Sequence, residues 1–504
     1  MKPSPSSVLA GPVLLARGAD ARCCRLSALT VVADVPGTAD EGGVLQPMGG
    51  EPVTARLLGT EVGHRFLVHD FELPAAADAH YLFDGERHDV VTRFDAPLRL
   101  AYVSCNGLEH GDLDRPAEER NLMWARLRDE HAARPFALLL QGGDQLYADE
   151  ASGAHPTLRE WADAPLDERY RHDFDEAAER AAMRFFVERY LHLYTRPELV
   201  AVLASVPSVM MWDDHDIFDG WGSHPAELLD SPVGRGLFDV ARRAFLLLQR
   251  GLSPSDSEPG DSLSFALRFP GFDLLVPDLR SERRPEQVFG AKGRAEMERQ
   301  LDDSAAVEHV FLMSSVPLLG PRLSLLERMI GVVPKIRRYE DDLRDQWQSR
   351  AHRAEWRWML ERLDALADSG TEVSVLSGEI HLASRGEMPL SSGATLHQLI
   401  ASGIAHPAPS SWWARALGAL ARLGEDPLPG RRVTLHPLPG QRGIYVAERN
   451  YLVLSRAAGG DWSATWECED SGRSPALALS ADGAAGRSAA SSRTALASGG
   501  GRGR

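Results

Sequence analysis

The chain of 504 residues is poor in cysteine and in positive charge. Its four cysteines, two of them adjacent at Cys23 and Cys24, are too few for a disulfide framework and favour a reducing compartment. The formal net charge of -17 argues against a general nucleic-acid binder, which needs a basic surface. We therefore expect no nucleic-acid partner, although local basic pockets are compatible with this composition.

Long apolar runs are also absent from the sequence. No stretch reaches the ~18 consecutive apolar residues that a transmembrane helix needs. Residues 1–20 contain one lysine, no Arg-Arg pair and an apolar stretch broken by Gly11 and Pro12, so neither a secretory nor a twin-arginine signal is predicted. We expect a cytoplasmic protein without a membrane span, and the composition leaves its oligomeric state open.

The composition that is present, 43% hydrophobic and 25% charged, is that of a soluble globular protein. One large domain with a smaller companion is expected, because single cores stop growing at about 250–300 residues. Short alternating apolar runs and the Asp84-Gly85 turn signal predict a small all-β module over residues 1–95. We predict a large α/β domain over 96–470 and a disordered tail, rich in Ser, Ala, Gly and Arg, over 471–504.

Strands and helices alternate after residue 97, which predicts an α/β fold. Open α/β sheets bind ligands at the carboxyl ends of their strands, so the residues that directly follow each strand are candidates for function. Apolar runs predict strands at Leu98–Val103, 136–140, Ser208–Met211, Phe272–Val276, His309–Met313 and 372–376. Helical periodicity predicts helices at 117–133, 198–204 and 354–367.

The first of these strands ends in a thiol. Cys105 follows the apolar run directly, and Asn106 and a glycine come next. A cysteine in this position is a candidate metal ligand. The alternative is a small buried core residue, because free cysteine is among the most buried residue types.

The second strand runs into Gly142, Gly143 and then Asp144. The glycines allow a sharp turn, so that the Asp144 carboxylate points across the edge of the sheet. A carboxylate there suits a bridge between two cations, and Tyr147 or Asp149 can add a second contact. The alternative is an aspartate that caps the next helix.

Two further strands end in dense polar clusters. Residues 212–216 (Trp-Asp-Asp-His-Asp) place three carboxylates around His215. Like charges this close are costly unless cations or hydrogen bonds neutralise them, which favours a metal site over a solvated loop. After the strand at 372–376, Glu379 and His381 stand two residues apart and can reach the same site if the backbone stays extended.

Two weaker features lie outside these clusters. Arg280 follows a strand and is a candidate phosphate-binding arginine, with a solvated arginine-rich surface run as the equal alternative. Residues 410–423, with Trp412 and Trp413, form an amphipathic pattern that suits a helix at a membrane or at the site entrance. Packing of that helix against the core is the favoured interpretation.

Together these segments resemble the alkaline phosphatase D-like (PhoD-like) branch of the calcineurin-like metallophosphatases. The resemblance covers roughly residues 11–465, and the Gly-Asp-Gln-Leu-Tyr and Trp-Asp-Asp-His-Asp segments are its most specific parts. It implies an α/β metallophosphatase sandwich, two mixed β-sheets flanked by helices, preceded by the all-β module. The matching segments are 104–106 (Ser-Cys-Asn), 143–149 (Gly-Asp-Gln-Leu-Tyr-Ala-Asp), 212–216 and 377–381 (Ser-Gly-Glu-Ile-His).

The resemblance further implies two metal ions bridged by Asp144. A thiolate and a phenolate suit Fe³⁺, whereas carboxylates suit Ca²⁺, Mn²⁺ or Mg²⁺, and Zn²⁺ is a further alternative. The implied ligands are Cys105, Tyr147 and His381 for one ion and Asp214 and Glu379 for the other, with Asp213 either ligating or orienting.

The remaining roles that the resemblance implies concern the substrate. His215 faces the phosphate and protonates the leaving group, while Asp216 holds its ring through the other nitrogen. Asn106 is assigned to substrate binding. Relatives often carry aspartate where this chain has Glu379, and the longer side chain is expected to shift the second metal and weaken activity.

The predicted function is a metal-dependent phosphoric ester hydrolase, a phosphatase or phosphodiesterase, in which two cations activate hydroxide and clamp the phosphoryl oxygens. Its partner is a small-molecule phosphate ester, and the sequence does not separate monoesters from diesters. The alternative is a catalytically degenerate metallophosphatase-fold protein that binds metal or a partner without turnover. The presence of Asp144 and His215 argues against that alternative.

Overall fold

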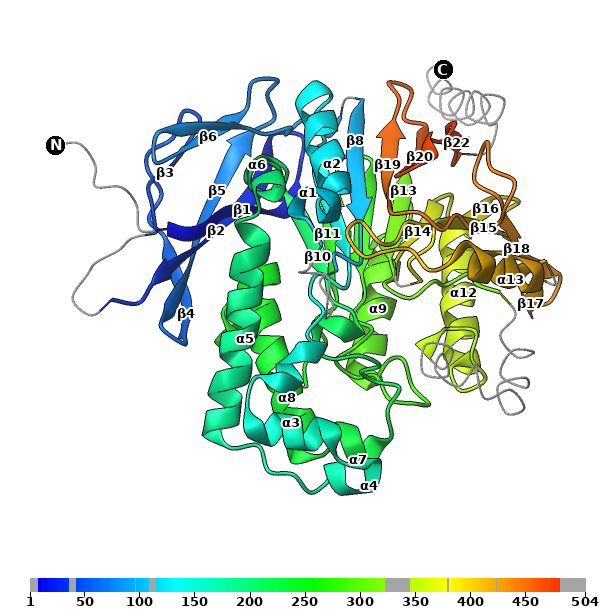
Figure 1. The fold of residues 1–504 in the computed structure, drawn as a ribbon. Coiled ribbons are helices and arrows are strands. Elements are labelled where there is room, and N and C mark those ends of the chain that lie inside the picture. The colour runs from blue at the N-terminus through cyan, green and yellow to red at the C-terminus, as the bar shows by residue number, and fades with distance from the viewer. Residues whose placement is uncertain are drawn as a thin grey trace, which may run out of the picture.

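Two large β-sheets form the centre of the protein. The computed structural model describes residues 8–35, 42–95, 97–107, 115–258, 260–321, 345–378, 380–422 and 424–480. Apolar side chains from both sheets, among them Leu100, Leu138, Leu274 and Phe311, pack in one buried cluster. This arrangement, two mixed sheets with helices outside them (Figure 1), confirms the predicted α/β sandwich.

The first sheet has the strand order β21-β20-β19-β8-β9-β10-β1-β2-β5-β4, with β22 paired to β20. Strands β8, β9 and β10 are parallel neighbours in its middle. Its strands are β1 (Val8–Ala19), β2 (Cys23–Ala33), β4 (Arg56–Glu61), β5 (His64–Pro74), β8 (Leu98–Val103), β9 (Leu138–Gly142), β10 (Ser208–Met211), β19 (Asn450–Arg456), β20 (Trp462–Cys468), β21 (Gly472–Arg473) and β22 (Leu477–Ala478).

The N-terminal region consists of strands, as predicted. A small sheet of β3 (Leu45–Pro47), β6 (His80–Phe83) and β7 (Glu86–Asp89) lies beside the long strands β1, β2 and β5. Strand β1 pairs in parallel with β10, with Leu15 opposite Ser208. The N-terminal strands therefore extend the central sheet by main-chain hydrogen bonds, and the domain division at residue 95 stays a prediction.

The second sheet has the order β11-β12-β13-β14-β16-β15-β18-β17. Strands β12, β13, β14 and β16 run parallel, so their carboxyl ends meet at one edge. The strands are β11 (Phe265–Phe269), β12 (Phe272–Val276), β13 (His309–Met313), β14 (Glu372–Ser377), β15 (Ser384–Pro389), β16 (Thr395–Ile400), β17 (Glu425–Leu428) and β18 (Arg431–His436).

The helices cover the sheets and form a group at one end, where Figure 1 shows α3, α5, α7 and α8 below the strands. The predicted helix at 117–133 is divided at Asn121 into α1 and α2. No helix in the described part of the chain is long and apolar enough to cross a membrane. The helices are α1 (Ala117–Arg120), α2 (Leu122–Ala133), α3 (Pro156–Asp163), α4 (Leu166–Arg169), α5 (Glu176–Tyr194), α6 (Pro197–Ser205), α7 (Ala226–Leu229), α8 (Pro232–Ala244), α9 (Ala291–Asp303), α12 (Arg353–Asp368) and α13 (Ser411–Ala421).

Two C-terminal features bear on the sequence predictions. Helix α13 buries Ala414 and Ala421 against a small apolar cluster, while Trp412 is 72% exposed. Strands β21 and β22 pair with β20, so the packed chain continues beyond residue 471, where the disordered tail was predicted to begin. Residues 481–504 lie outside the described part of the chain.

Candidate metal centre

The candidate site lies at the carboxyl ends of five strands from both sheets: β8, β9, β10, β14 and β16. Strand β8 leads to Cys105, β9 to Asp144, β10 to Asp213 and Asp214, and β14 to His381. Main-chain hydrogen bonds join the ends of β8 and β9, where the amides of Cys105 and Asn106 donate to the carbonyls of Gly143 and Asp144. The sandwich thereby brings together side chains that are far apart in the sequence.

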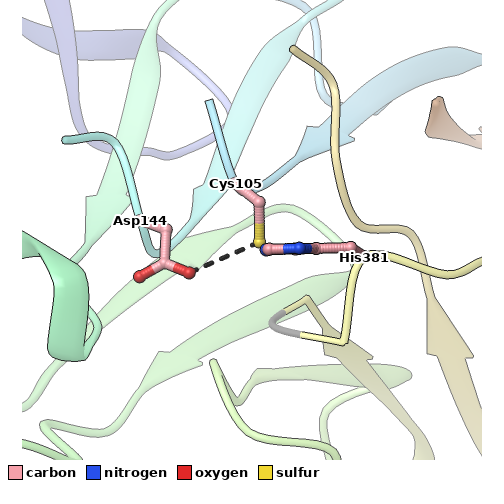
Figure 2. Close-up of side chains that lie close together, drawn as sticks. All are labelled: Cys105, Asp144 and His381. Atoms are coloured by element: carbon pink, nitrogen blue, oxygen red, sulfur yellow. Dashed lines mark hydrogen bonds between the residues drawn. The ribbon is translucent and has the colours of Figure 1, made fainter. Parts of the chain in front are cut away.

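One cluster of potential ligands contains Cys105, Asp144 and His381, whose ligand atoms all lie within 4.8 Å of one another. Figure 2 shows the three side chains converging, with Cys105 Sγ 3.4 Å from Asp144 Oδ2. Tyr147 joins this cluster, since its Oη lies 2.8 Å from His381 Nε2. The four residues that the resemblance assigned to this part of the centre are therefore adjacent.

The backbone at this cluster is strained. Among the described residues, six non-glycine residues have a φ angle in the left-handed region, and three of them are Cys105 (51°), Asp144 (54°) and His381 (51°). Such conformations cost on the order of 1–3 kcal/mol each and concentrate at functional sites. The strain has a geometric effect here, because each residue turns its side chain from a strand end into the common centre.

A second cluster contains Asp144, Asp213 and Asp214. Asp144 is thus common to both clusters, the position expected of a bridging carboxylate. Burial, followed by the charges of Cys105 and Asp213, raises the pKa of Asp144 well above its usual value. Burial likewise raises the pKa of Asp213 to about 6. Carboxyl groups held this close and this deep need positive charge to ionise.

The residues present fit a pair of cations. Asp144 Oδ1 is buried and has no hydrogen-bond partner among the described residues, although buried carboxylate oxygens are normally satisfied. Burial and the neighbouring histidines lower the pKa of His381 well below its usual value, which keeps its imidazole in the neutral form that binds metals. Sulfur, imidazole and phenol on one side and carboxylates on the other are suitable donors for two cations of different character.

Arg280 is placed in neither of the two ways that the sequence left open. Its side chain is fully buried, so it is neither a solvated surface residue nor open to a phosphate. Its guanidinium donates to Asp213 Oδ1 at 2.5 Å and to both oxygens of Asp345 at 2.9 and 2.7 Å. Ser315 also donates to Asp213 Oδ1 at 2.6 Å. Arg280 therefore neutralises and orients a carboxylate beside the centre, and its donors are used for that purpose.

The partner of the His215 ring is also different from the prediction. His215 Nδ1 lies 2.8 Å from Asp149 Oδ2, whereas Asp216 points elsewhere. Burial raises the pKa of Asp149, but the charge and hydrogen bond of His215 lower this pKa by more than burial raises it. The pKa of Asp149 therefore lies below its usual value. Burial lowers the pKa of His215, but Asp214 and Asp149 raise it well above its usual value. The two side chains form an ion pair.

Asp216 instead organises the backbone of the site. Its carboxylate accepts hydrogen bonds from the amides of Leu146 at 3.0 Å and Asp213 at 2.9 Å, and from Gln249 Nε2 at 3.0 Å. Because residues 214–216 form a 3₁₀ turn, Asp216 points back toward the strand ends while His215 points outward. The structure thus assigns Asp216 to the turn that presents Asp213, Asp214 and His215.

The two remaining predicted residues are placed differently. Asn106 is buried beside the centre, and its Oδ1 accepts a hydrogen bond from Trp124 Nε1 at 2.7 Å. Its amide nitrogen Nδ2 finds no partner within the described part of the chain. Glu379, the predicted second-ion ligand, lies outside the described residues.

Sequence analysis missed the fifth strand end, which follows β16. Ser402 Oγ lies 3.1 Å from Cys105 Sγ and accepts a hydrogen bond from the amide of His381. The ring of His406 lies 3.7 Å from that of His381 and stacks on that of Tyr147 at 5.2 Å, centroid to centroid. The same strand-end rule applied to the apolar run at 395–400 would have selected this segment.

Comparisons with known proteins concern the family and the fold of the chain. Residues 90–339 match the model of the PhoD related phosphatase family. The solved structure of PhoD has a similar fold, with a TM-score of 0.55 and 12% sequence identity over 95% of this chain and 90% of that one. A looser similarity, with a TM-score of 0.49 and 8% identity over 93% and 74% of the two chains, is found to purple acid phosphatase PPD1 from seeds of yellow lupin, Lupinus luteus.

Among curated proteins, uncharacterized protein YGR266W of Saccharomyces cerevisiae is 24% identical over 383 residues. The aligned part is 63% of this chain and 53% of the yeast protein. The chain thus spans about half the length of this relative, and we infer no activity from this comparison.

Proposed function

We propose that the chain is a PhoD-like metallophosphatase and a metal-dependent hydrolase of small-molecule phosphate esters, on the match of residues 90–339 to the PhoD related phosphatase family. Membership of the family supports a metallophosphoesterase function in general terms. The observation that supports the specific proposal most strongly is the position of Asp144, which belongs to both ligand clusters and has a buried oxygen without a partner in the described chain.

We assign one cation to Cys105, Tyr147 and His381, and the second to Asp214, with Asp144 between them. When bound, the two cations would activate a water molecule and neutralise the phosphoryl oxygens during attack. Glu379 keeps its predicted place as a ligand of the second cation. Fe³⁺ with Ca²⁺ suits these donors, and Mn²⁺, Zn²⁺ or Mg²⁺ are the alternatives.

Asp213 acts in this proposal as an orienting residue rather than as a ligand. Its Oδ1 already accepts hydrogen bonds from Arg280 and Ser315, which fix the carboxylate in one place. Both donors are buried, so the arrangement resists rotation of the side chain. Asp213 is then a carboxyl group of fixed orientation, paired with Arg280, beside the shared carboxylate of Asp144.

His215 is the proposed proton donor to the leaving alkoxide. Asp149 accepts from its Nδ1, which fixes the orientation of the ring and leaves Nε2 for the ester oxygen. Stacking of the ring on Tyr147, with centroids 4.3 Å apart, restrains it on a second side. Asn106 supplies a neutral donor for a phosphoryl oxygen, since its buried Nδ2 has no other partner in the described structure.

The proposal is tested by hydrolysis of aryl phosphate mono- and diesters by the purified protein with added iron, calcium, manganese or zinc. Metal-dependent turnover in the parent protein, lost in Asp144→Ala, would support it, and the preferred ester would define the substrate class. Turnover that persists in Asp144→Ala would contradict it. Absence of turnover with every metal would favour the degenerate binding protein.

The cytoplasmic location stays a prediction.

A further inference from the structure

Ser402 touches two of the proposed metal ligands at once. Its side chain is fully buried in the turn after β16. Its Oγ lies 3.1 Å from Cys105 Sγ and 2.9 Å from the amide nitrogen of His381. Asn450 Nδ2 donates to the carbonyl of Ser402 at 2.8 Å, which anchors the turn to β19. The hydroxyl is therefore held between the two ligands.

The direction of these hydrogen bonds follows from donor counts. The amide of His381 can only donate, so Ser402 Oγ accepts from it. The single hydroxyl hydrogen of Ser402 then remains for the sulfur of Cys105, because the thiol hydrogen of Cys105 is directed to Asp144 Oδ2 at 3.4 Å. When Cys105 loses its hydrogen to bind a cation, the hydrogen bond from Ser402 to sulfur is retained.

The neighbouring serine does not duplicate this contact. Ser104 Oγ lies 3.6 Å from Cys105 Sγ, a longer separation, and it donates to the carbonyl of Ala401 at 3.0 Å. Its hydroxyl hydrogen is thus directed to an oxygen, whereas that of Ser402 is directed to the sulfur. Of the two serine hydroxyls beside this sulfur, that of Ser402 is therefore the closer and the one with its hydrogen available for it.

We propose that Ser402 is a positioning residue that hydrogen-bonds the Cys105 sulfur and holds His381, and so sets the electron donation of the sulfur to the cation at that subsite. This inference rests on the proposed function for the presence of the cation. A hydrogen bond to a metal-bound sulfur withdraws electron density from it and thereby tunes the metal. The sulfur would donate more strongly without Ser402.

The test uses the full chain loaded with Co²⁺ or Fe³⁺ and measures the sulfur-to-metal charge-transfer absorption. Ser402→Ala should move this band to longer wavelength, because the sulfur becomes the richer donor. Ser402→Thr, which keeps a hydroxyl, should restore the original position. Ser374→Ala removes an equally buried serine hydroxyl that contacts His309 instead, and it should leave the band unchanged, whereas Cys105→Ala should abolish the band.

A second measurement needs no variant at Ser402. The metal–sulfur vibration of the parent protein should shift on exchange into D₂O, because the donated hydrogen becomes deuterium. An unmoved band in Ser402→Ala, a missing isotope shift or a parent protein without any sulfur-to-metal band would overturn the inference. A band that shifts as expected in a protein that hydrolyses no ester would uphold it and reject the proposed function alone.

Discussion

The Nδ1 atom of His215 and the Oδ2 atom of Asp149 lie 2.8 Å apart, although the residues are 66 positions apart in the sequence. Asp149 begins the turn that follows the Asp144 segment, and His215 follows β10, so the pair connects two strand ends. The amide of Asp219 donates to the other oxygen of Asp149 at 2.6 Å. Asp149 is thereby fixed at both oxygens.

Asp149→Asn should lower kcat for phosphate ester hydrolysis by about 10²-fold, because general acid–base catalysis contributes at least that much and needs the correctly oriented ring. KM and metal content should change little. Esters with good leaving groups should lose less activity, since they need less protonation. Glu150→Gln changes the adjacent carboxylate, which pairs with Arg189 instead, and should leave kcat unaltered. An Asp149→Asn variant with full activity would show that His215 needs no partner.

Asp216→Ala should act on stability. Two main-chain amides and Gln249 would lose their acceptor in a buried place, which costs about 1–3 kcal/mol in free energy of unfolding for each donor left unsatisfied. Urea unfolding of the metal-free variant measures this loss. A variant as stable as the parent but with kcat reduced as far as in Asp149→Asn would return Asp216 to the role that the sequence suggested.

Stability of the metal-free protein should depend on pH. Burial raises the pKa of Asp216 to about 7 and that of Asp213 to about 6. A carboxyl with a raised folded-state pKa contributes stability below its unfolded pKa and loses it as pH rises through the folded value. Free energy of unfolding should therefore fall between about pH 4 and about pH 7.

Added cations should reverse this trend, because they favour the ionised carboxylates. The gain in melting temperature on adding Mn²⁺ should be larger near the upper end of that pH range than near the lower end. Denaturation curves with chelator and with Mn²⁺ at both ends measure the difference. An equal gain at both pH values would mean that these carboxyls do not ionise on metal binding.

Arg280→Met should destabilise the protein by about 3–5 kcal/mol, since its removal leaves the buried carboxylate of Asp213 without a cation and leaves Asp345 with Arg283 alone. Chemical denaturation measures the change. In the folded fraction, the factor by which KM for a phosphate ester rises should not exceed the factor by which kcat falls. Arg280 is too deeply buried to bind the substrate directly. A raised KM with unchanged stability and kcat would show that Arg280 contacts phosphate.

The elements that the sequence predicted best are buried parallel strands. The bounds of β8, β10, β12 and β13 agree with the prediction, because continuous apolar runs ended by polar residues leave little freedom in assignment. The convergence of Cys105, Asp144 and His381 was also accessible, since parallel strands bring their ends to one edge. Strand order itself was not, because it depends on pairings such as that of β1 with β10.

What the sequence could not supply are side-chain directions inside turns and partners distant along the chain. Nothing in the sequence shows whether Asp216 or Asp149 is the partner of His215. The 3₁₀ turn at residues 214–216 decides this, because it turns the Asp216 carboxylate away from the His215 ring. The burial of Arg280 depends on Asp345, 65 residues away. Its arginine-rich surroundings in the sequence left phosphate binding and surface exposure as equal alternatives.

The most direct test of the account is the metal content of the purified protein and of Asp144→Asn, measured together with ester hydrolysis. If Asp144 is shared by two cations, the parent should bind two per chain, and Asp144→Asn should weaken the retention of both and lose turnover. Binding of a single cation, or an Asp144→Asn variant that keeps both cations and its activity, would contradict the account.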